Sequence, residues 1–333
     1  MINFETILPK EKQSILTEFL LGALKFNNIS VKAIDQDCST RVYYRIKSSS
    51  ESFIMMDSSL ESQSFFDFIK VQRILTDIGL TPPKIIHADI NNMLLLLEDF
   101  GDYSLKPYLE KNPNNKVEFY KNAIELLIKL HSYGASKELN YYSEDVLLNG
   151  LRKSVIKSYL PSIHPIITSE EAGNELEQIF ASLLKNYASI KKVIVLRDYH
   201  AENLMVLDNK TLGVIDFQDA MNGSATYDIL SLLEDARIDV SSNISSYCIN
   251  YYLERSNCNI EEFKYYYSVL SAQRNLRIIG LFHKFGYLDN KIKYKKCLPR
   301  VINYLNIRLQ DPILQDLSKW CIKYKILDND SII

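Results

Sequence analysis

Residues 193–220, which read VIVLRDYHAENLMVLDNKTLGVIDFQDA, decide the fold of this chain. The stretch contains three short apolar runs, at 193–196, 204–207 and 212–215. Short apolar runs separated by turns rich in Asp and Asn are typical of small paired strands. The pattern therefore predicts strands that bring three polar side chains, Asp198, Asn203 and Asp216, to one end.

The spacing of these three residues indicates a chemistry. Asn203 follows Asp198 by five residues and Asp216 follows it by eighteen, which is the spacing of a kinase catalytic loop and its metal-binding Asp-Phe. Phosphoryl transfer needs a carboxylate to orient a hydroxyl, here Asp198, and oxygen ligands for Mg²⁺, here Asn203 and Asp216. Asp and Asn are also common in ordinary loops. The strands, the turn and the Asp-Phe pair together favour the kinase interpretation.

The same stretch resembles the aminoglycoside phosphotransferase-like kinases. RDYHAENLM followed by GVIDFQDAMNGSATYDILSLLEDAR looks most like the bacterial amino-sugar 1-kinases, which phosphorylate N-acetylmuramate and N-acetylglucosamine. The resemblance covers nearly the whole chain and is weaker at QDCSTRVYYRI, LLLLEDFGDYSL and AQRNLRIIGLF. It implies ATP and Mg²⁺ as cofactors and the anomeric hydroxyl of a small amino sugar as the acceptor.

The composition restricts the classes of partner. The 333 residues carry a net charge of −2 with no block of like charge, which gives no support for binding to nucleic acid or to an anionic membrane. Five scattered cysteines form no metal or disulfide framework and indicate a cytoplasmic protein with reduced thiols. The N-terminus does not read as a signal peptide, and no apolar run is long enough to span a bilayer. No obligate protein partner is evident.

Hydrophobic periodicity predicts an α+β chain, and the resemblance implies a two-lobed, protein-kinase-like fold. Strands are predicted at 29–34, 42–46, 53–56, 83–88 and 93–97. Helices are predicted at 3–26, 59–78, 115–133, 143–160, 169–189 and 259–287, with a breaker at 161–165, Thr226 as the cap of a further helix, and helix starts at Pro299 and Pro312. A small β-sheet lobe at 1–98, a hinge at 99–104 and a larger, mostly helical catalytic and substrate lobe at 105–333 follow from this pattern.

The resemblance also implies where the nucleotide binds. In kinases the hinge presents backbone groups to adenine, which implies four residues, Glu98, Asp99, Phe100 and Gly101. An ordinary strand-to-helix turn explains this stretch equally well. The loop over the phosphates corresponds to 36–41, where Ser39, Thr40 and Arg41 could contact phosphate oxygens. Placement of Arg41 on an exposed edge is the alternative.

Two departures from the family pattern stand out, and a third feature, a missing lysine, departs only from kinases in general, because the family itself tends to have Met-Asp there. The phosphate loop has no glycine, and Gln36 stands where the family has Gly. The strand at 52–57 has no lysine for the phosphates, so Arg41 or Arg45 is the candidate cation, with Glu61 as its possible partner. Leu196 stands two residues before Asp198, where the family usually has His.

Further candidates surround the acceptor by resemblance. His200 either contacts the phosphates or substrate, or holds the loop by a backbone hydrogen bond. The other candidate substrate residues are Gln218, Asp235, Arg274 and Arg277, and surface placement of the last two is equally compatible with the sequence. Asp228 either complements a helix dipole or is buried and braces the catalytic loop. The short segment from Asp216 to the next helix favours a small molecule over a peptide as acceptor.

Two rival functions remain open from the sequence. The same fold could phosphorylate another small acceptor, such as an aminoglycoside or an amino alcohol. The missing glycines and Leu196 are compatible with a nucleotide-binding pseudokinase. Retention of Asp198, Asn203 and Asp216 together argues against the pseudokinase.

Overall fold

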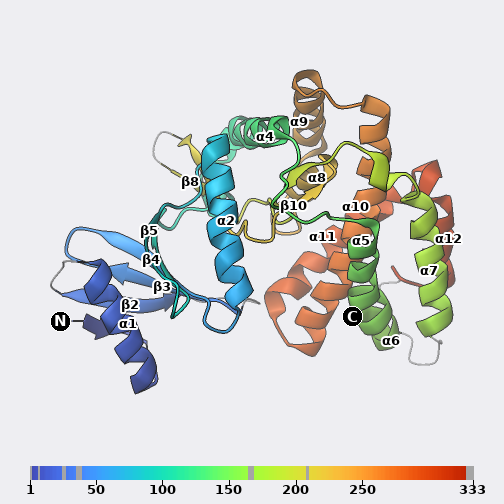
Figure 1. The fold of residues 1–333 in the computed structure, drawn as a ribbon. Helices are drawn as coiled ribbons and strands as arrows, with labels where there is room; N and C mark the ends of the chain where they lie inside the picture. The colour runs from blue at the N-terminus through green and yellow to red at the C-terminus, as the bar shows by residue number, and fades with distance from the viewer. Residues whose placement is uncertain are drawn as a thin grey trace. The chain divides into compact units, whose positions relative to one another are not determined.

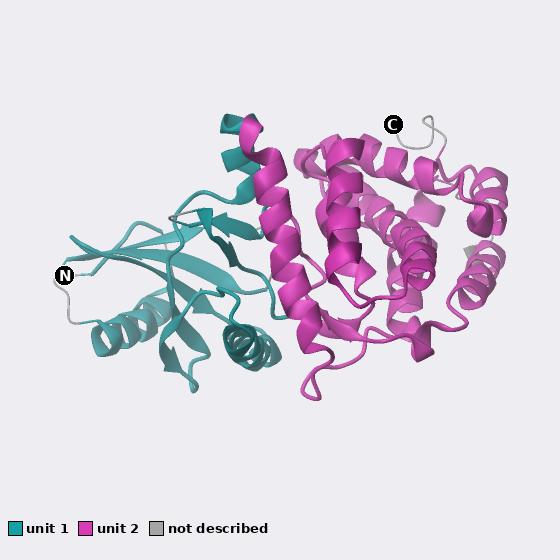
Figure 2. Cartoon of the chain, turned by 90° about the horizontal axis from the view of Figure 1, so that it is seen from above, with its two compact units in different colours: residues 1–113, 202–219 teal, residues 114–201, 220–333 magenta. Residues whose placement is uncertain are grey.

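The computed structural model describes residues 2–6, 8–24, 28–34, 40–163, 169–207 and 210–327. The chain divides into two compact units, one of residues 1–113 and 202–219, the other of residues 114–201 and 220–333 (Figure 2). The first unit contains the large sheet and the second is mostly helical, as predicted. The lobe boundary at residue 98 and the hinge at 99–104 stay predictions.

A six-stranded sheet with the order β1-β2-β3-β4-β6-β5 dominates the first unit (Figure 1). Its strands are β1 (Ile2–Phe4), β2 (Ile29–Ile34), β3 (Val42–Lys47), β4 (Ser52–Asp57), β5 (Ile85–Asp89) and β6 (Leu94–Glu98). The β1–β2 pair is parallel and the other neighbours are antiparallel. The predicted helix at 3–26 is wrong at its start, because residues 2–4 form β1 and the helix begins after Pro9, which has no N–H to donate.

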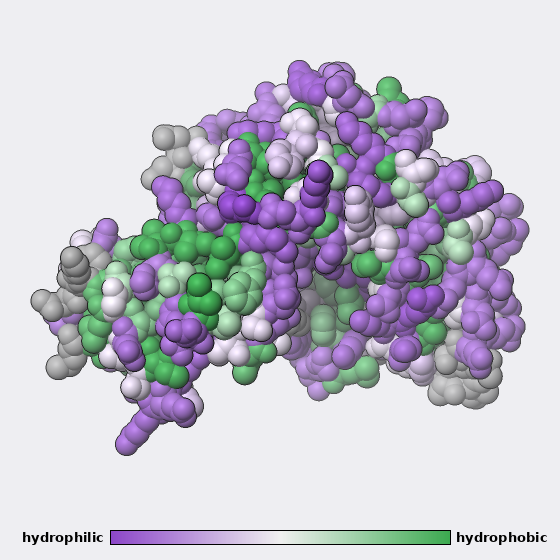
Figure 3. All heavy atoms as spheres, in the orientation of Figure 1, coloured by the Kyte–Doolittle hydropathy of each residue, from purple (hydrophilic) through white to green (hydrophobic). Residues whose placement is uncertain are grey.

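Helices α1 (Lys10–Ala23) and α2 (Ser62–Ile78) bury apolar faces in the same unit. Helix α1 packs Leu16, Phe19 and Leu20 into a core with residues of β2, β3, β4 and β6. Helix α2 ends at Gly79, whose φ of 81° is the left-handed conformation that glycine adopts without steric cost. On the face in Figure 3, hydrophobic side chains gather over the strands of this unit.

A hairpin distant in sequence completes the first unit. Strands β8 (Leu204–Val206) and β9 (Leu212–Val214) pair with each other. The Val206 N–H donates to the Tyr103 carbonyl (2.8 Å), and the Val214 N–H donates to the Thr81 carbonyl (2.9 Å). The Phe217 ring packs on Phe68 of α2, with 4.8 Å between ring centroids. Helix α3 (Leu105–Lys111) also belongs to this unit.

The second unit is built from helices and one small strand pair, β7 (Val193–Val195) with β10 (Met221–Gly223). The helices are α4 (Lys116–Tyr133), α5 (Glu144–Leu151), α6 (Leu160–Ile163), α7 (Ser169–Leu183), α8 (Thr226–Leu233), α9 (Ser242–Arg255), α10 (Ile260–His283), α11 (Ile292–Arg308) and α12 (Gln315–Lys323). Two π-helical stretches, Arg152–Tyr159 and Lys284–Leu288, extend α5 and α10. Within the described ranges, no helix is both long enough and apolar enough to cross a membrane.

Three predicted helix signals of this unit need correction. Pro299 lies inside α11 and does not start it. Pro161 lies within α6, so the chain stays helical there, and Pro165 is outside the described residues. Thr226 is the first residue of α8 after the cap residue Ala225, because Ser224 supplies the oxygen that accepts from the Thr226 N–H (3.4 Å). Pro312 does begin a short 3₁₀ helix, as predicted.

Candidate active site

A buried carboxylate holds the loop that follows β7. The Asp228 side chain of α8 is fully buried, and its oxygens accept from the backbone N–H groups of Leu196 (2.6 Å) and Arg197 (2.8 Å). Burial raises the pKa of Asp228 to about 7, while these two hydrogen bonds oppose the rise. Arg197 has a φ of 73°, and its carbonyl accepts from the Ser231 hydroxyl. The bracing role that the resemblance implies for Asp228 is therefore present in the contacts.

A second buried carboxylate holds the far side of the same loop. Asp235 is fully buried, accepts from the Ala201 N–H (3.1 Å) and also accepts from the Arg237 N–H (2.8 Å). Burial raises the pKa of Asp235 above its ordinary value. The Asp235 carboxylate therefore holds the loop through its backbone. The substrate contact predicted for Asp235 stays a prediction.

Between these two braces, Asp198 is half-buried in a positive environment. Burial acts to raise the pKa of Asp198, but the charges of His200 and of three arginines outweigh it and lower the pKa below its ordinary value. These arginines are Arg277, Arg197 and Arg237. Burial also lowers the pKa of His200 far below its ordinary value, so at neutral pH the arginines carry the positive charge. Asp198 is thus ionised at neutral pH.

The candidate metal ligands lie on the β8–β9 hairpin of the first unit. Asn203 precedes β8 and Asp216 follows β9, and the Ile215 N–H donates to the Asn203 carbonyl (3.0 Å). The Asn203 amide nitrogen lies 3.5 Å from Oδ2 of Asp216. Asp216 has a φ of 58°, and its side chain is 43% exposed. The hairpin thus brings the amide and the carboxylate together and leaves the carboxylate open to solvent.

Arg41 and Gln218 contact the same oxygen of Asp216. The guanidinium of Arg41 donates to Oδ1 of Asp216 (3.0 Å) and to the Ser64 hydroxyl (2.7 Å), and Arg41 is only 8% exposed. The Gln218 amide donates to Oδ1 of Asp216 (3.0 Å) and to Asp219 (3.1 Å). The alternative of an exposed edge position for Arg41 is therefore wrong. Gln218 lies beside the candidate metal ligand Asp216, and its predicted contact with substrate stays a prediction.

The predicted phosphate loop is described only at its end. Residues 35–39, including Ser39 and Gln36, are outside the described residues. The Thr40 hydroxyl donates to the carboxylate of Glu61 at the start of α2.

Arg45, the other candidate phosphate cation, lies on the predicted hinge. It forms an ion pair with Asp99 (2.9 Å), pairs with Asp102 and donates to the Gly101 carbonyl (3.0 Å). Asp99 also accepts from the Gly101 N–H (2.9 Å), and Gly101 has a φ of 81°. Sequence reasoning missed this clamp. The only signal for it is the acidic pair at 99 and 102, which does not identify its cation.

Two other residues of the predicted hinge, Glu98 and Phe100, make specific contacts. Glu98 exchanges hydrogen bonds with Lys84, whose N–H donates to the Glu98 carboxylate (3.2 Å). Phe100 packs on Gly213 of β9 so closely that a Cβ at Gly213 would lie 2.6 Å from the ring. Glycine at 213 is thus required by the position of the Phe100 ring.

The two arginines predicted to contact substrate differ in environment. Arg274 is 3% exposed and donates to the Glu234 carbonyl (3.3 Å). Arg277 is half-buried and donates to the Tyr227 hydroxyl (3.4 Å). Surface placement, the alternative left open by the sequence, is therefore wrong for Arg274.

The candidate metal-binding groups fit Mg²⁺ better than a transition metal. In the described part of the chain, no cluster of three or more His, Cys, Asp and Glu residues could hold a metal ion. Mg²⁺ keeps several waters and needs only one or two protein carboxylates. The exposed carboxylate of Asp216 beside the Asn203 amide meets that requirement.

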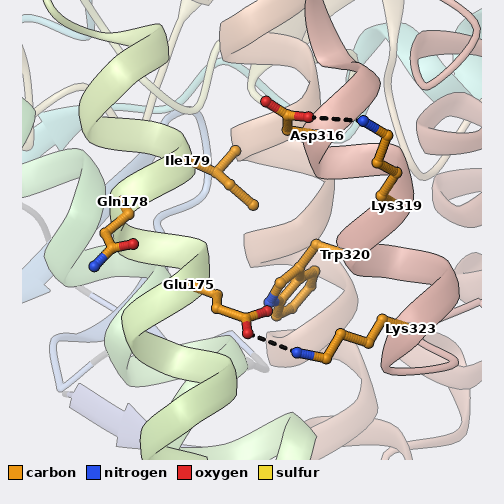
Figure 4. A pocket seen from close by; sticks show the side chains of 7 residues that line it. All are labelled: Glu175, Gln178, Ile179, Asp316, Lys319, Trp320 and Lys323. Atoms are coloured by element: carbon orange, nitrogen blue, oxygen red, sulfur yellow. Dashed lines mark hydrogen bonds and ion pairs between the residues drawn. The ribbon is translucent and has the colours of Figure 1, made fainter.

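A depression lies between α7 and α12 (Figure 4). Its volume is about 300 Å³. Its charged side chains pair with each other, Glu175 with Lys323 (2.6 Å) and Asp316 with Lys319 (3.2 Å). These pairs leave it without the reactive groups seen around Asp198.

The fold places the chain in a class of protein. The choline kinase LicA from Streptococcus pneumoniae matches with a TM-score of 0.63 at 14% identity, over 89% of this chain and 99% of that chain. The ADP-bound aminoglycoside phosphotransferase APH(2'')-Ib matches with a TM-score of 0.60 at 16% identity, over 88% of this chain and 96% of that one. These similarities confirm the two-lobed, protein-kinase-like fold.

Residues 30–256 match the family model described as the phosphotransferase enzyme family, and the chain belongs to that family. A curated relative from Caulobacter vibrioides, named N-acetylmuramate/N-acetylglucosamine kinase, is 28% identical over 356 aligned positions. The alignment covers 95% of this chain and 98% of the relative. The predicted family and the prediction of a small-molecule kinase are confirmed.

Proposed function

We propose that the chain transfers the γ-phosphoryl group of ATP to the anomeric hydroxyl of N-acetylmuramate or N-acetylglucosamine. The observation that carries this proposal is the ionised Asp198 on a loop held by two buried carboxylates, Asp228 and Asp235. The name and the coverage of the Caulobacter relative support the class of acceptor. The ADP-bound neighbour supports nucleotide binding.

Asn203 and Asp216 would hold Mg²⁺ through an amide oxygen and a carboxylate. When bound, Mg²⁺ neutralises charge that develops on the transferred phosphoryl group. Arg41 supplies the cation that the strand at 52–57 lacks, because its guanidinium already lies against Asp216 and can reach phosphate oxygens beside it. In this proposal the Thr40 hydroxyl, which donates to Glu61 in the structure, would turn to the same phosphates, and Ser39 would add a second hydroxyl donor.

The hinge binds adenine in this proposal. Backbone groups of residues 98–101 would pair with the ring, and the Arg45 clamp on Asp99 and Gly101 fixes that backbone. Phe100, seated on Gly213, couples the hinge to the hairpin that carries the metal ligands. The four hinge residues thus act through their backbone and packing more than through their charges.

Asp198 orients the acceptor hydroxyl and takes up its proton. The acceptor oxygen forms a bond to the γ-phosphorus, the bond to the β-phosphate oxygen breaks, and ADP leaves. Asn203 follows Asp198 by five residues, so chain connectivity keeps the base and the ligand within roughly 17 Å. An anomeric hydroxyl is more acidic than an ordinary alcohol, so a carboxylate of low pKa is a sufficient base for it.

The rival functions receive less support. A pseudokinase has no need for an ionised Asp198 together with Asn203 and Asp216. An aminoglycoside acceptor, being cationic, is disfavoured by the three arginines around Asp198. The proposal names a small molecule as the partner, involves no nucleic acid, membrane or obligate protein partner, and keeps the cytoplasm as the predicted location.

The test is a panel of acceptors incubated with Mg-ATP. It contains both sugars, choline and an aminoglycoside, and phosphorus–proton correlation NMR identifies the product. We expect transfer to at least one sugar, with phosphorus coupled to the proton on C1, and an acid-labile, non-reducing product. Coupling to the protons on C6, or transfer to neither sugar, would overturn the proposal.

A further inference from the structure

The three arginines around Asp198 differ in what they contact. Arg197 lies over the ring of Tyr142, with its guanidinium carbon 5.2 Å from the ring centroid. The guanidinium of Arg237 lies 3.9 Å from the carboxylate of Asp235. That carboxylate also accepts from the backbone N–H of Arg237. Arg277 donates to the hydroxyl of Tyr227 (3.4 Å). Arg277 and Arg197, which donates to the Met221 sulfur (3.9 Å), thus both have a described hydrogen-bond partner that does not balance the arginine charge.

The surroundings of Arg277 form a built site. Tyr142 donates to the Tyr227 hydroxyl (3.0 Å), the two rings meet edge to face, and both are at most 2% exposed. Gly150 of α5 leaves room for the arginine, since a Cβ at Gly150 would lie 3.0 Å from Cδ of Arg277. The two phenols and the glycine therefore fix the guanidinium by packing, while Arg277 itself stays only half-buried.

The neighbouring Arg274, one turn earlier in α10, is closed in by protein groups. It is nearly fully buried and donates to the carbonyl of Glu234 (3.3 Å). The carboxylate of Glu234 is itself occupied by three side chains, Ser271, Asn275 and Arg308. The described partners of Arg274 are thus protein groups, and Arg277 is the cation of α10 that we assign to the acceptor.

We propose that Arg277 binds the carboxylate of an acidic acceptor and thereby sets the preference between the two sugars. N-Acetylmuramate carries a lactyl carboxylate that N-acetylglucosamine lacks, and a guanidinium binds carboxylates with two parallel hydrogen bonds. An acidic acceptor would also be repelled by the ionised Asp198, and the charge of Arg277 offsets that repulsion. This inference rests on the proposed function.

Arg277 also affects Asp198, and the test must separate this effect from the contact with the acceptor carboxylate. Its charge favours the ionised form of Asp198, so its loss raises the pKa of that carboxylate and changes the base for every acceptor. The carboxylate contact affects the acidic acceptor alone. The ratio of kcat/KM for N-acetylmuramate to that for N-acetylglucosamine cancels the shared effect and isolates the contact.

The experiment measures this ratio in the parent, in Arg277→Gln and Arg277→Lys, and in Gly150→Ala. We expect Arg277→Gln to lower the ratio by roughly 10- to 100-fold, the usual loss for a hydrogen bond to a charged group. Arg277→Lys keeps the charge without the planar donor pair and should lower it less. Gly150→Ala crowds Cδ of Arg277 and leaves the charge in place, so a smaller drop of the same sign is expected.

Any turnover of N-acetylglucosamine shows that a variant has folded, and its rate carries the effect shared by both acceptors. Equal losses for both sugars in Arg277→Gln, together with an unchanged ratio in Gly150→Ala, would overturn the inference and leave the proposed function standing. Transfer to neither sugar by the parent would refute the proposed function itself. The two failures are therefore distinguishable.

Discussion

Asp198 and Asp216 are held in place by different contacts. Asp198 is carried by a loop whose backbone is fixed by Asp228 and Asp235, and its charge is favoured by arginines. Asp216 has a left-handed backbone conformation, and its carboxylate is approached by Arg41 and Gln218. Because these contacts are separate, substitution of one carboxylate should leave the function of the other intact.

Asp216→Asn removes the carboxylate proposed to bind the metal. It should weaken Mg-ATP binding and abolish turnover. Asp198→Asn should leave Mg-ATP binding intact and lower kcat by roughly 10²–10⁴, the range for a positioned acid–base group. Calorimetric titration of Mg-ATP into each variant measures the first effect. Binding by Asp216→Asn that equals the parent would show that the metal site is assigned to the wrong residue.

A buried histidine should make stability depend on pH. His131 of α4 is 5% exposed and lies 2.8 Å from the Tyr252 hydroxyl, and burial lowers its pKa to about 3. The unfolded chain protonates this imidazole below about pH 6.5, whereas the folded chain does so only near pH 3. The free energy of unfolding therefore falls as the pH drops through this window, by up to about 1.4 kcal/mol per pH unit.

His131→Gln keeps a hydrogen-bonding group for Tyr252 and removes the titration. Urea unfolding at pH 7 and pH 5 should show a smaller loss of stability in this variant than in the parent. His87→Gln, at an exposed histidine, is the control and should keep the parental loss. An unchanged loss in His131→Gln would mean that the imidazole is protonated in the folded protein.

At the scale of residues, sequence reasoning succeeds where the signal is local. Asp198, Asn203 and Asp216 lie within one short stretch, and spacing alone proposes their roles. The ion pair of Arg45 with Asp99 joins residues that are distant in sequence. The order of the strands in the sheet brings them together, and the sequence pattern does not give that order. The burial of Arg274 is equally hidden, because α10 is buried on nearly every side and offers no polar face to read.

At the scale of elements, periodicity predicts most helices of the second unit. The predicted helices at 115–133 and 259–287 correspond to α4 and to α10 with its π-helical extension. Periodicity could not predict that α11 continues through Pro299, because the loss of one backbone hydrogen bond is a local cost that packing against α10 offsets. Periodicity could not predict the π-helical stretch at 152–159 either, because the helix that packs against it, α10, is distant in sequence.

That packing depends on a glycine. A Cβ at Gly280 of α10 would lie 2.3 Å from the carbonyl oxygen of Ser154, a backbone atom that cannot move alone. Gly280→Ala should therefore destabilise the protein by about 1–3 kcal/mol, the usual cost of overpacking. Gly22→Ala in α1, where nothing lies within 4 Å, is the matched control and should stabilise by about 0.5–1 kcal/mol. Thermal unfolding of both variants measures the difference, and shifts of equal sign would contradict the packing argument.

At the scale of the whole molecule, the first unit is discontinuous in sequence. Residues 202–219 complete it although 88 residues, 114–201, separate them from its main part. The hairpin satisfies the carbonyls of Thr81 and Tyr103 and covers the ring of Phe68. The sequence pattern places the hairpin beside the catalytic loop but gives no sign that it packs with the N-terminal strands.

A fragment of residues 1–113 should therefore be less stable than the same unit in the full chain. It lacks the donors for two carbonyls and exposes Phe68, which together remove stability of the same order as a small unit possesses. The matched control is a fusion of 1–113 to 202–219 through a Gly/Ser linker. Urea unfolding should show a cooperative transition in the fusion at a higher midpoint than in the fragment, and equal midpoints would refute the role given to the hairpin.

The discontinuity also matters while the protein is being made. The ribosome releases the N-terminal strands first, but the hairpin that completes their unit emerges only after another 88 residues. At about 5–20 residues per second, this delay is roughly 4–18 s. During that time the nascent sheet carries unpaired carbonyls and an uncovered aromatic ring, so the first part of the chain to be synthesised is among the last to finish folding. The need for chaperone protection is consequently greatest at the start of the chain, during synthesis of residues 114–201.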